Sequence, residues 1–209
     1  MSPELSTVSP RLRRAVLADA AALATLAADT FTETFGADNR PEDLAAHLAA
    51  SYGIAQQTAE LQDPAVITLV AEQDGALVGF AQIRRQDAPA SVTAAAAEQA
   101  ASTTHAATTH AATHVDPRPV ELHRLYLRRV AHGTGLGAAL MQGAREAAVA
   151  LGGTHLWLGV WERNPRAIAF YTKSGFVRVG SHDFFVGDDR QTDWLLMTPL
   201  PSAGHLANA

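Results

Sequence analysis

The pattern of hydrophobic and polar residues predicts regular elements along almost the whole chain. Near the N-terminus, apolar residues recur at helical spacing in three segments, and strand-like alternation lies on either side. Asp74-Gly75 separates two apolar runs and is a strong hairpin signal. The predicted order is a strand at Arg11–Val16, helices that begin after Asp19, at Pro41 and at Ile54, and strands at Val66–Ala71 and Ala76–Ile83.

Residues 87–118 break this pattern because they are rich in Ala, Thr and His. Such a composition offers little apolar surface to bury, and the segment is long for a connection in a compact domain. We therefore expect a low-complexity insertion that is mostly mobile, with partial helix over Ala94–Ala101. His105, His110 and His114 are candidate metal ligands, but no carboxylate or cysteine is interleaved with them, so we predict no metal site.

A strand, a glycine turn and a helix follow over Val120–Leu151. Gly133, Gly135 and Gly137 remove every other side chain from the turn, and the apolar helix face begins at Leu136, inside it. A helix N-terminus whose first amides carry few side chains binds anions through its free N–H groups and the helix dipole. We expect this anion to be a pyrophosphate.

Several kinds of glycine loop compete for this turn. A Walker A loop ends in Gly-Lys-Ser/Thr, but Ala138 and Ala139 follow Gly137. A Rossmann fingerprint needs G-x-G-x-x-G and an acidic residue about 20 positions on, whereas the spacing here is G-x-G-x-G and residues 155–157 are not acidic. An ordinary tight connection that uses glycine for positive φ is a further alternative from the loop alone.

The predicted C-terminal elements are three strands and one helix. His155–Trp161 is a buried strand that contains Gly159, and glycine inside a strand often marks the close approach of another backbone or a ligand. Asn164 caps the following helix, and Gly175 closes it. The last strands are predicted at Phe176–Val179 and Asp193–Met197, joined by a link over residues 182–189.

Composition narrows the function classes. A chain of 209 residues suits one domain, and no apolar run is long enough to span a membrane. The absence of cysteine excludes disulfides, thiolate metal sites and an acyl-cysteine intermediate. The formal net charge of −5 argues against nucleic acid and is compatible with a cationic substrate. We expect a cytoplasmic protein that does not bind membranes, and the sequence is compatible with a homodimer.

Four segments in order resemble the GNAT family of N-acyltransferases: the strand Glu121–Leu127, the loop His132–Gly137, the strand Leu156–Trp161 and the motif Asn164-x-x-Ala167-x-x-Phe170-Tyr171-x-x-x-Gly175-Phe176. His132 stands where the family's loop, Gln/Arg-x-x-Gly-x-Gly/Ala, has Gln or Arg. The resemblance implies an α/β (α+β) fold with a mixed sheet of about six or seven strands, flanked by helices, and a splayed central strand pair. It implies one domain over residues 10–200, interrupted by the insertion at 87–118, with a disordered leader at 1–9 and a tail at 201–209.

The same resemblance implies acetyl-CoA as the acyl donor. Backbone amides near Leu125 and Leu127 would hold the acyl and pantetheine parts as an added strand does. The loop amides would hold the pyrophosphate, and Asn164 would meet the pantetheine or adenosine arm. The implied cofactor-binding residues are Leu125, Tyr126, Leu127, His132, Gly133, Thr134, Gly135, Leu136, Gly137, Ala138, Asn164, Ala167 and Tyr171.

Three residues are candidates for the acid–base chemistry. A protonated amine with a pKa of ~10.4 must lose a proton before it attacks a thioester. The resemblance places Glu121 as the base, with His123 on the same strand face as an alternative. It places Tyr171 as the acid for the leaving thiolate; a tyrosine of pKa ~10 is a weaker acid than a thiol of ~8.5, so its role is assistance. The alternatives are a half-exposed strand carboxylate for Glu121 and a core aromatic for Tyr171.

The prediction of the acceptor depends on resemblance over shorter segments. Residues 30–35, Trp157–Glu162 and Gly187–Asp193 resemble the PaiA-type polyamine acetyltransferases. Aromatic rings with carboxylates suit a linear polycation such as spermidine or spermine. The alternatives are acetylation of a protein N-terminus or lysine, and a regulatory module that binds CoA without turnover. The candidate substrate residues are Phe31, Glu33, Phe35, Asp183 and Phe184.

Overall fold

The computed structural model describes residues 10–106 and 116–201. The predicted leader, residues 107–115 of the insertion and residues 202–209 lie outside them. Within the described residues, seven strands form one mixed sheet in the order β1-β2-β3-β4-β5-β7-β6. Strands β4 and β5 pair in parallel, whereas β1–β2, β5–β7 and β6–β7 pair antiparallel. The prediction of a mixed sheet of six or seven strands with flanking helices is therefore confirmed.

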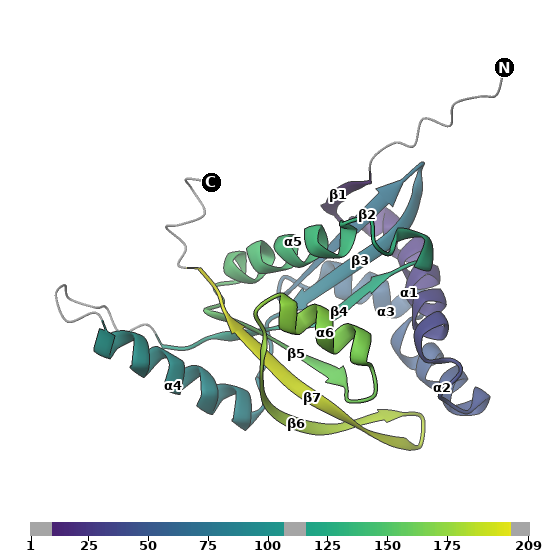
Figure 1. Ribbon diagram of the computed structural model, residues 1–209. Coiled ribbons are helices and arrows are strands. Elements are labelled where there is room, and N and C mark those ends of the chain that lie inside the picture. Colours follow the sequence, from purple (N-terminus) through teal and green to yellow (C-terminus); the bar gives the residue numbers. More distant parts are fainter. Residues whose placement is uncertain (1–9, 107–115, 202–209) are drawn as a thin grey trace. The chain divides into compact units, whose positions relative to one another are not determined.

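The element bounds agree with most of the predicted ones (Figure 1). The strands are β1 Arg11–Arg14, β2 Val66–Gln73, β3 Ala76–Arg84, β4 Pro119–Leu127, β5 His155–Trp161, β6 Val177–Val186 and β7 Asp189–Pro199. The helices are α1 Ala20–Phe35, α2 Pro41–Ser51, α3 Ile54–Gln62, α4 Ala90–Ala106, α5 Leu136–Ala150 and α6 Pro165–Lys173.

The chain forms two compact units. Unit 1 comprises the residues up to Gln82 together with Arg124–Ala144, and unit 2 comprises Ile83–His123 together with the residues from Arg145 onward. The boundary falls inside β3, β4 and α5, so each of these elements belongs partly to both units. The single domain over residues 10–200 stays a prediction.

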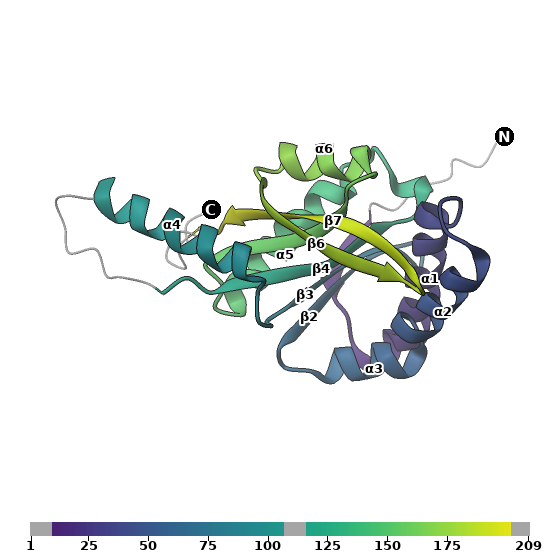
Figure 2. The same cartoon turned by 90° about the horizontal axis from the view of Figure 1, so that it is seen from below.

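In unit 1, helices cover both faces of the β2–β3 hairpin. Thr68 Oγ1 accepts a hydrogen bond from Gln82, which also donates to Glu60 on α3, so this face of β2 is turned to α3. Adjacent strand residues point to opposite faces, and a side chain at Gly143 of α5 would collide with Leu69. Figure 2 shows α3 beside β2. The predicted turn closes the hairpin with Asp74 at φ 51° and Gly75 at φ 77°.

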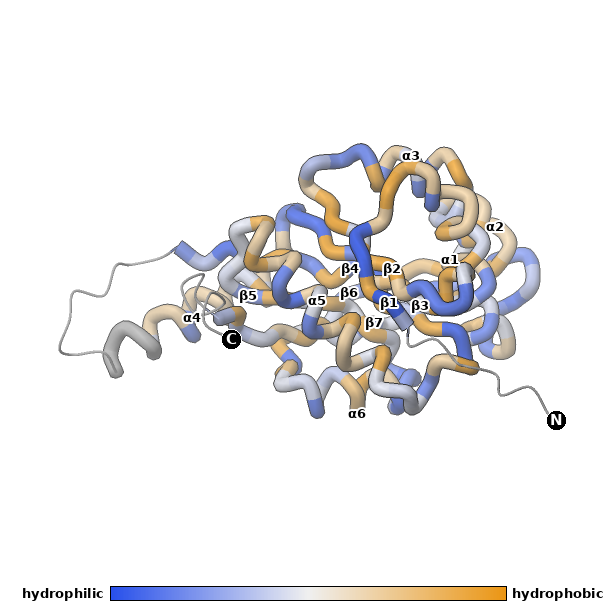
Figure 3. The backbone as a smooth tube through the Cα atoms, turned by 90° about the horizontal axis from the view of Figure 1, so that it is seen from above, coloured by the Kyte–Doolittle hydropathy of each residue, from blue (hydrophilic) through white to orange (hydrophobic). Residues whose placement is uncertain are grey.

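The hydrophilic strand β1, blue in Figure 3, is held by ion pairs. Arg13 lies 2.7 Å from Asp19 and 2.9 Å from Glu72 of β2. Asp19 precedes α1 as predicted, but its carboxylate binds Arg13 and the Val16 amide and makes no capping bond to α1. The ion pair with Arg13 lowers the pKa of Asp19 below its ordinary value.

In unit 2, the predicted link over residues 182–189 is wrong. These residues continue β6 and begin β7, and only Gly187 and Asp188 form the turn of a long hairpin. The segment is polar and exposed over His182 and Asp183, so it lacks the apolar alternation that identifies a strand. The ladder with β7 supplies its backbone hydrogen bonds instead.

The expected mobile stretch of the insertion is also wrong where the structure describes it. Residues 90–106 form α4, which is longer than the predicted Ala94–Ala101. Its side chains Val92 and Ala96 are fully buried against Trp157, Leu195 and Met197 of β5 and β7. Alanine favours the helix, and a sheet face in unit 2 provides the apolar surface that the segment lacks by itself.

Replacing Val92 by Ala should lower the free energy of unfolding by roughly 1–3 kcal/mol, because it leaves a cavity between α4 and the sheet. Denaturant unfolding measures this loss. Val177→Ala is the matched control, since that valine is 53% exposed and its truncation should change stability little. Equal effects of the two changes would contradict the packing of α4.

Candidate functional site

The glycine loop of unit 1 has the geometry of an open anion site. Gly133 and Gly135 have φ of 78° and 87°, and a side chain at either would meet no atom within 4 Å. Both glycines are exposed. The Leu136 amide donates to Thr134 Oγ1 at 3.4 Å, and the first helical bond of α5 runs from the Ala139 amide to the Gly135 carbonyl. The amides of Gly137 and Ala138 therefore have no acceptor inside the helix. The loop therefore presents free donors at the positive end of a helix dipole.

Two side chains shape this loop by binding its own backbone. His132 Nε2 lies 3.1 Å from the Leu127 carbonyl oxygen. Thr134 donates to the Ala131 carbonyl oxygen at 2.8 Å. Both contacts hold the turn between β4 and α5. The ring of His132 thus contacts the end of β4.

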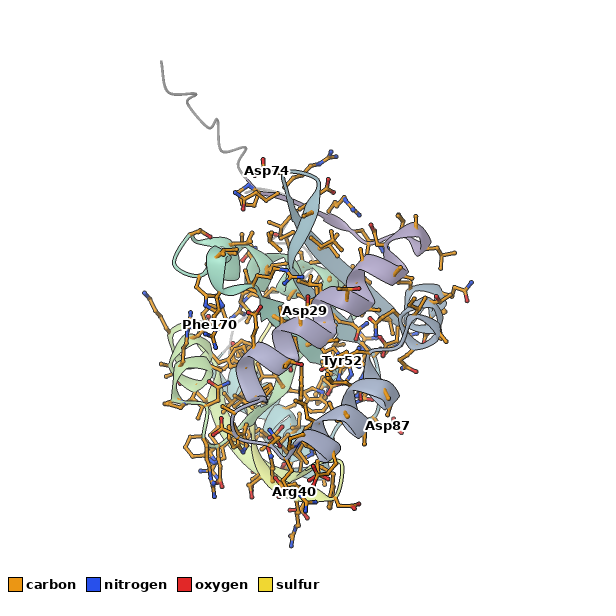
Figure 4. All side chains as sticks on the ribbon, turned by 90° about the vertical axis from the view of Figure 1, so that its right-hand side faces the viewer. Asp29, Arg40, Tyr52, Asp74, Asp87 and Phe170 are labelled. Carbon is orange, nitrogen blue, oxygen red and sulfur yellow. The ribbon has the colours of Figure 1, made fainter. Side chains whose placement is uncertain are left out.

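The first substrate candidates of unit 1 lie in a packed aromatic cluster. Phe31 is 2% exposed, and its ring lies 4.6 Å from both Phe35 and His47 and 5.5 Å from Tyr52. Figure 4 labels Tyr52, which follows α2. Tyr126 of β4 approaches the Phe31 ring edge-on at 6.4 Å. Phe31 is therefore a core residue of unit 1 that supports its neighbours in the cluster.

Two arginines after β4 bind α1. Arg128 lies 2.7 Å from Asp29, labelled in Figure 4, and 3.9 Å from Glu33. Arg129 donates to the Glu33 backbone carbonyl at 2.9 Å. The carboxylate of Glu33, a predicted substrate residue, is thus already near a cation of its own unit.

Arg124 is a buried charge of unit 1 that the sequence reasoning left without a role. It donates to Glu60 and to Gln82, each at 2.7 Å, and its guanidinium lies over the Tyr52 ring. Burial would raise the pKa of Glu60, but the charge of Arg124 and the surrounding hydrogen bonds outweigh it, so that pKa lies below its ordinary value. The signal in the sequence was a charged residue on an apolar strand.

In unit 2, Glu121 is a buried carboxylate with several partners. It accepts hydrogen bonds from Arg84 and, at 2.8 Å, from Gln86, and His123 Nδ1 lies 3.6 Å away. Burial alone would raise the pKa of Glu121, but its contact with His123 and the charge of Arg84 lower it below the ordinary value. A carboxylate held in its ionised form is a weak base. The base role of Glu121 stays a prediction, and His123 lies beside it as the alternative.

Tyr171 of α6 is 9% exposed and contacts the rings of Phe170, labelled in Figure 4, and Phe176. Burial raises the pKa of its hydroxyl above the ordinary value, so it is a weaker acid than a free tyrosine. Asn164 accepts from the Ala167 amide at 3.0 Å and caps α6 as predicted. Its side-chain carbonyl oxygen is thus used by the helix. The acid and cofactor roles of these residues stay predictions.

The β6–β7 hairpin of unit 2 contains two carboxylates that differ in exposure and in pairing. Asp183 is 46% exposed and pairs with Arg190 at 2.9 Å. Asp193 is 8% exposed, and its Oδ1 atom has no hydrogen-bond partner within the described part of the chain. Burial raises the pKa of Asp193 to about 6. The sequence reasoning missed Asp193, although a charged residue at the start of the apolar run Trp194–Met197 was the available signal.

The predicted site residues therefore fall into two groups. Unit 1 contains the glycine loop, Leu125–Leu127 and the α1 residues, and unit 2 contains Glu121, His123, Tyr171, Asn164 and the hairpin residues. Among residues 10–106 and 116–201, no group of three or more His, Cys, Asp or Glu is placed to hold a metal ion. In the same ranges, no helix is both long and apolar enough to cross a membrane.

Comparison with known proteins identifies the family. Residues 21–176 match the model of the acetyltransferase (GNAT) family. The chain belongs to the GNAT family. A relative from Lactobacillus delbrueckii subsp. lactis, named as an N-acetyltransferase in the pepI 3′ region, is 34% identical over 82% of this chain and 87% of its own length. An N-acetyltransferase of Mycobacterium tuberculosis is 32% identical over 88% of this chain and 99% of its own. The protein is thus an acetyl-CoA-dependent N-acetyltransferase of the GNAT type.

Solved structures agree on the fold. The PaiA N-acetyltransferase of Thermoplasma acidophilum, solved with coenzyme A, has a TM-score of 0.65 and 18% identity, and the match covers 92% of this chain and 99% of that one. A GNAT acetyltransferase of Streptococcus pneumoniae has a TM-score of 0.60 and 21% identity, over 92% and 100% of the two chains. At these identities the likeness shows the GNAT fold alone.

Replacing Gly135 by Asp should abolish acetyl-CoA binding, because a side chain and a negative charge would enter the open space in front of the α5 amides. Calorimetry with acetyl-CoA measures the loss. Gly75→Asp is the matched control: its φ of 77° imposes the same backbone strain, its surroundings are equally open, and it lies in the β2–β3 turn. Near-native affinity in folded Gly135→Asp would refute the loop assignment.

Proposed function

We propose that this GNAT enzyme transfers the acetyl group of acetyl-CoA directly to a primary amine of a polyamine such as spermidine or spermine. The observation on which the proposal rests is the open glycine loop at the N-terminus of α5, whose free amides suit the pyrophosphate of the donor. Because the chain has no cysteine, an acyl-cysteine intermediate is excluded. Direct attack in a ternary complex is the simplest remaining route.

In this route the acceptor must lose a proton and the leaving thiolate must gain one. The amine nitrogen attacks the thioester carbonyl carbon, the C–S bond breaks, and CoA leaves as a thiolate. Glu121 and His123 are the predicted proton acceptors, and they lie side by side on β4 of unit 2. Tyr171 is the predicted donor. Its burial favours the protonated hydroxyl, which is the form that a donor requires, but makes the transfer itself less favourable.

Support for a polyamine comes from sequence likeness and charge. Trp157–Glu162 and Gly187–Asp193 resemble PaiA-type enzymes, and the PaiA structure of Thermoplasma acidophilum is among the similar folds. The net charge of −5 favours the approach of a polycation. One observation speaks against a polyamine: the predicted substrate residue Asp183 is already paired with Arg190. Acetylation of a protein N-terminus or lysine is therefore the competing acceptor class. A cytoplasmic location and a homodimer stay predictions from the sequence.

A panel of acceptors separates these classes. Spermidine, spermine, simple monoamines, free amino acids and peptides with a free N-terminus or lysine are offered in parallel with acetyl-CoA, and the acetylated product is identified by mass spectrometry. We expect acetylated polyamine to form with the highest kcat/KM. Faster acetylation of peptides would contradict the polyamine and favour a protein N-terminus or lysine as the acceptor. CoA release without any acetylated product would refute N-acetylation of the acceptors tested.

Tyr171→Phe should lower kcat by roughly 10²-fold, because it removes the hydroxyl and keeps the ring that packs between Phe170 and Phe176. Acetyl-CoA affinity and the melting temperature should change little, and both are measured beside the rate. The defect should not recover at high pH, since protons for the thiolate become scarcer there. Full activity across the pH range would make Tyr171 a packed aromatic only.

A further inference from the structure

We propose that Asp193, with His182 and Gly159, forms the site in unit 2 that receives the ammonium group of the acceptor. The inference rests on the proposed function, since it names the residues that recognise the amine. The three residues come from three neighbouring strands, β7, β6 and β5.

The register of these strands places the residues on one sheet face. Directly opposite residues of paired strands project to the same side. Asp193 is opposite Trp161 of β5 and opposite His182 of β6. Gly159 is two positions from Trp161 and shares its face.

The same face carries the predicted catalytic pair. Glu121 of β4 is opposite Trp157 in the parallel ladder, and Trp157 is opposite Met197 of β7. His123 follows Glu121 by two positions. In unit 2 this face therefore presents the candidate bases of β4 and the carboxylate of Asp193.

Gly159 leaves open the place toward which two polar atoms point. A Cβ at this position would lie 3.1 Å from Asp193 Oδ2 and 3.2 Å from His182 Nε2. Gly159 and His182 are both exposed, so solvent reaches this place, whereas Asp193 is buried behind it. A glycine in an otherwise buried strand is explained if a ligand occupies the space that its side chain would fill.

Asp193 is a buried carboxylate whose charge is not balanced within the described part of the fold, as expected of a group that binds a cation. Its Oδ1 atom lacks a hydrogen-bond partner among the described residues, and no cation contributes to its pKa, which burial raises to about 6. His182 of β6 is the titratable group that faces it, and β5 contributes Gly159 and Trp161, which do not titrate as acids or bases near neutral pH. At neutral pH the carboxylate is mostly ionised and unbalanced, and a substrate ammonium supplies the missing opposite charge.

If Asp193 had only a structural role, its replacement should lower the stability of the protein. The proposed binding role predicts the opposite. A carboxyl whose pKa is raised by folding stabilises the protein below its unfolded pKa, and that contribution is lost as pH rises through about 6. At pH 8 the ionised Asp193 therefore destabilises the fold. Asp193→Asn removes this charge and should leave the melting temperature at pH 8 equal or higher.

The test is calorimetric titration of spermidine and n-propylamine into the full-length protein saturated with CoA at pH 8. Wild type should bind, and Asp193→Asn should bind roughly 10- to 100-fold more weakly, as expected for the loss of a charged hydrogen bond. Gly159→Ala, whose methyl group enters the same place, should also weaken amine binding. Affinity for acetyl-CoA should be unchanged in both variants.

Glu162→Gln is the matched control, because it removes an exposed carboxylate from the residue that directly follows β5 and should leave amine binding intact. Equal amine affinity of Asp193→Asn and wild type would overturn the site, as would no amine binding by wild type or a lower melting temperature of Asp193→Asn at pH 8. Amine binding that depends on Asp193, without acetylated product, would keep the site and refute the proposed function.

Discussion

Burying an ion costs several kcal/mol unless an opposite charge and hydrogen bonds accompany it, and β4 meets this constraint on both sides of the unit boundary. In unit 1, Arg124 is enclosed by Glu60, Gln82 and the Tyr52 ring. In unit 2, Glu121 is held by Arg84 and Gln86. Each pairing ties β4 to β3 and thereby fixes the strand that leads into the glycine loop.

The candidate binding groups are polar groups for which the fold supplies no complete set of partners. The α5 amides behind Gly133 and Gly135 have no acceptor inside the helix, and they suit an anion. Within the described residues Asp193 Oδ1 has no hydrogen-bond partner, and its carboxylate suits an ammonium group. The proposed reaction joins an anionic donor to a cationic acceptor, and these two groups are the ones that we propose to bind them. The buried carboxylate of Asp193 lowers stability in the free enzyme when it is ionised, which is the usual relation between a functional site and its fold.

The presence or absence of a nearby positive charge also distinguishes carboxylates that look alike in the sequence. Asp183 and Asp193 lie on the same hairpin, but Asp183 is half exposed beside Arg190, whereas Asp193 is buried and its Oδ1 atom has no partner among residues 10–106 and 116–201. Glu121 is buried like Asp193, yet its pKa moves down because Arg84 and His123 are near, while that of Asp193 moves up. Carboxylates on one sheet thus have different chemistry, and the cause is the charge beside each one.

The sequence by itself determined the features that short-range chemistry controls. Asp74-Gly75 turns because both residues adopt positive φ, α2 and α6 begin at prolines, and the glycine loop opens α5. The resemblance of the segments from Glu121 to Phe176 to the GNAT family implied the fold, and this prediction is confirmed. Only the tertiary structure decided what depends on distant partners. Residues 90–106 become a packed helix because Trp157, Leu195 and Met197 cover Val92 and Ala96. The partners of Arg124 and Glu121, Glu60 and Arg84, lie 64 and 37 residues away along the chain. A carboxylate's burial and charge balance are set by such neighbours, so its chemistry cannot be assigned until they are in place.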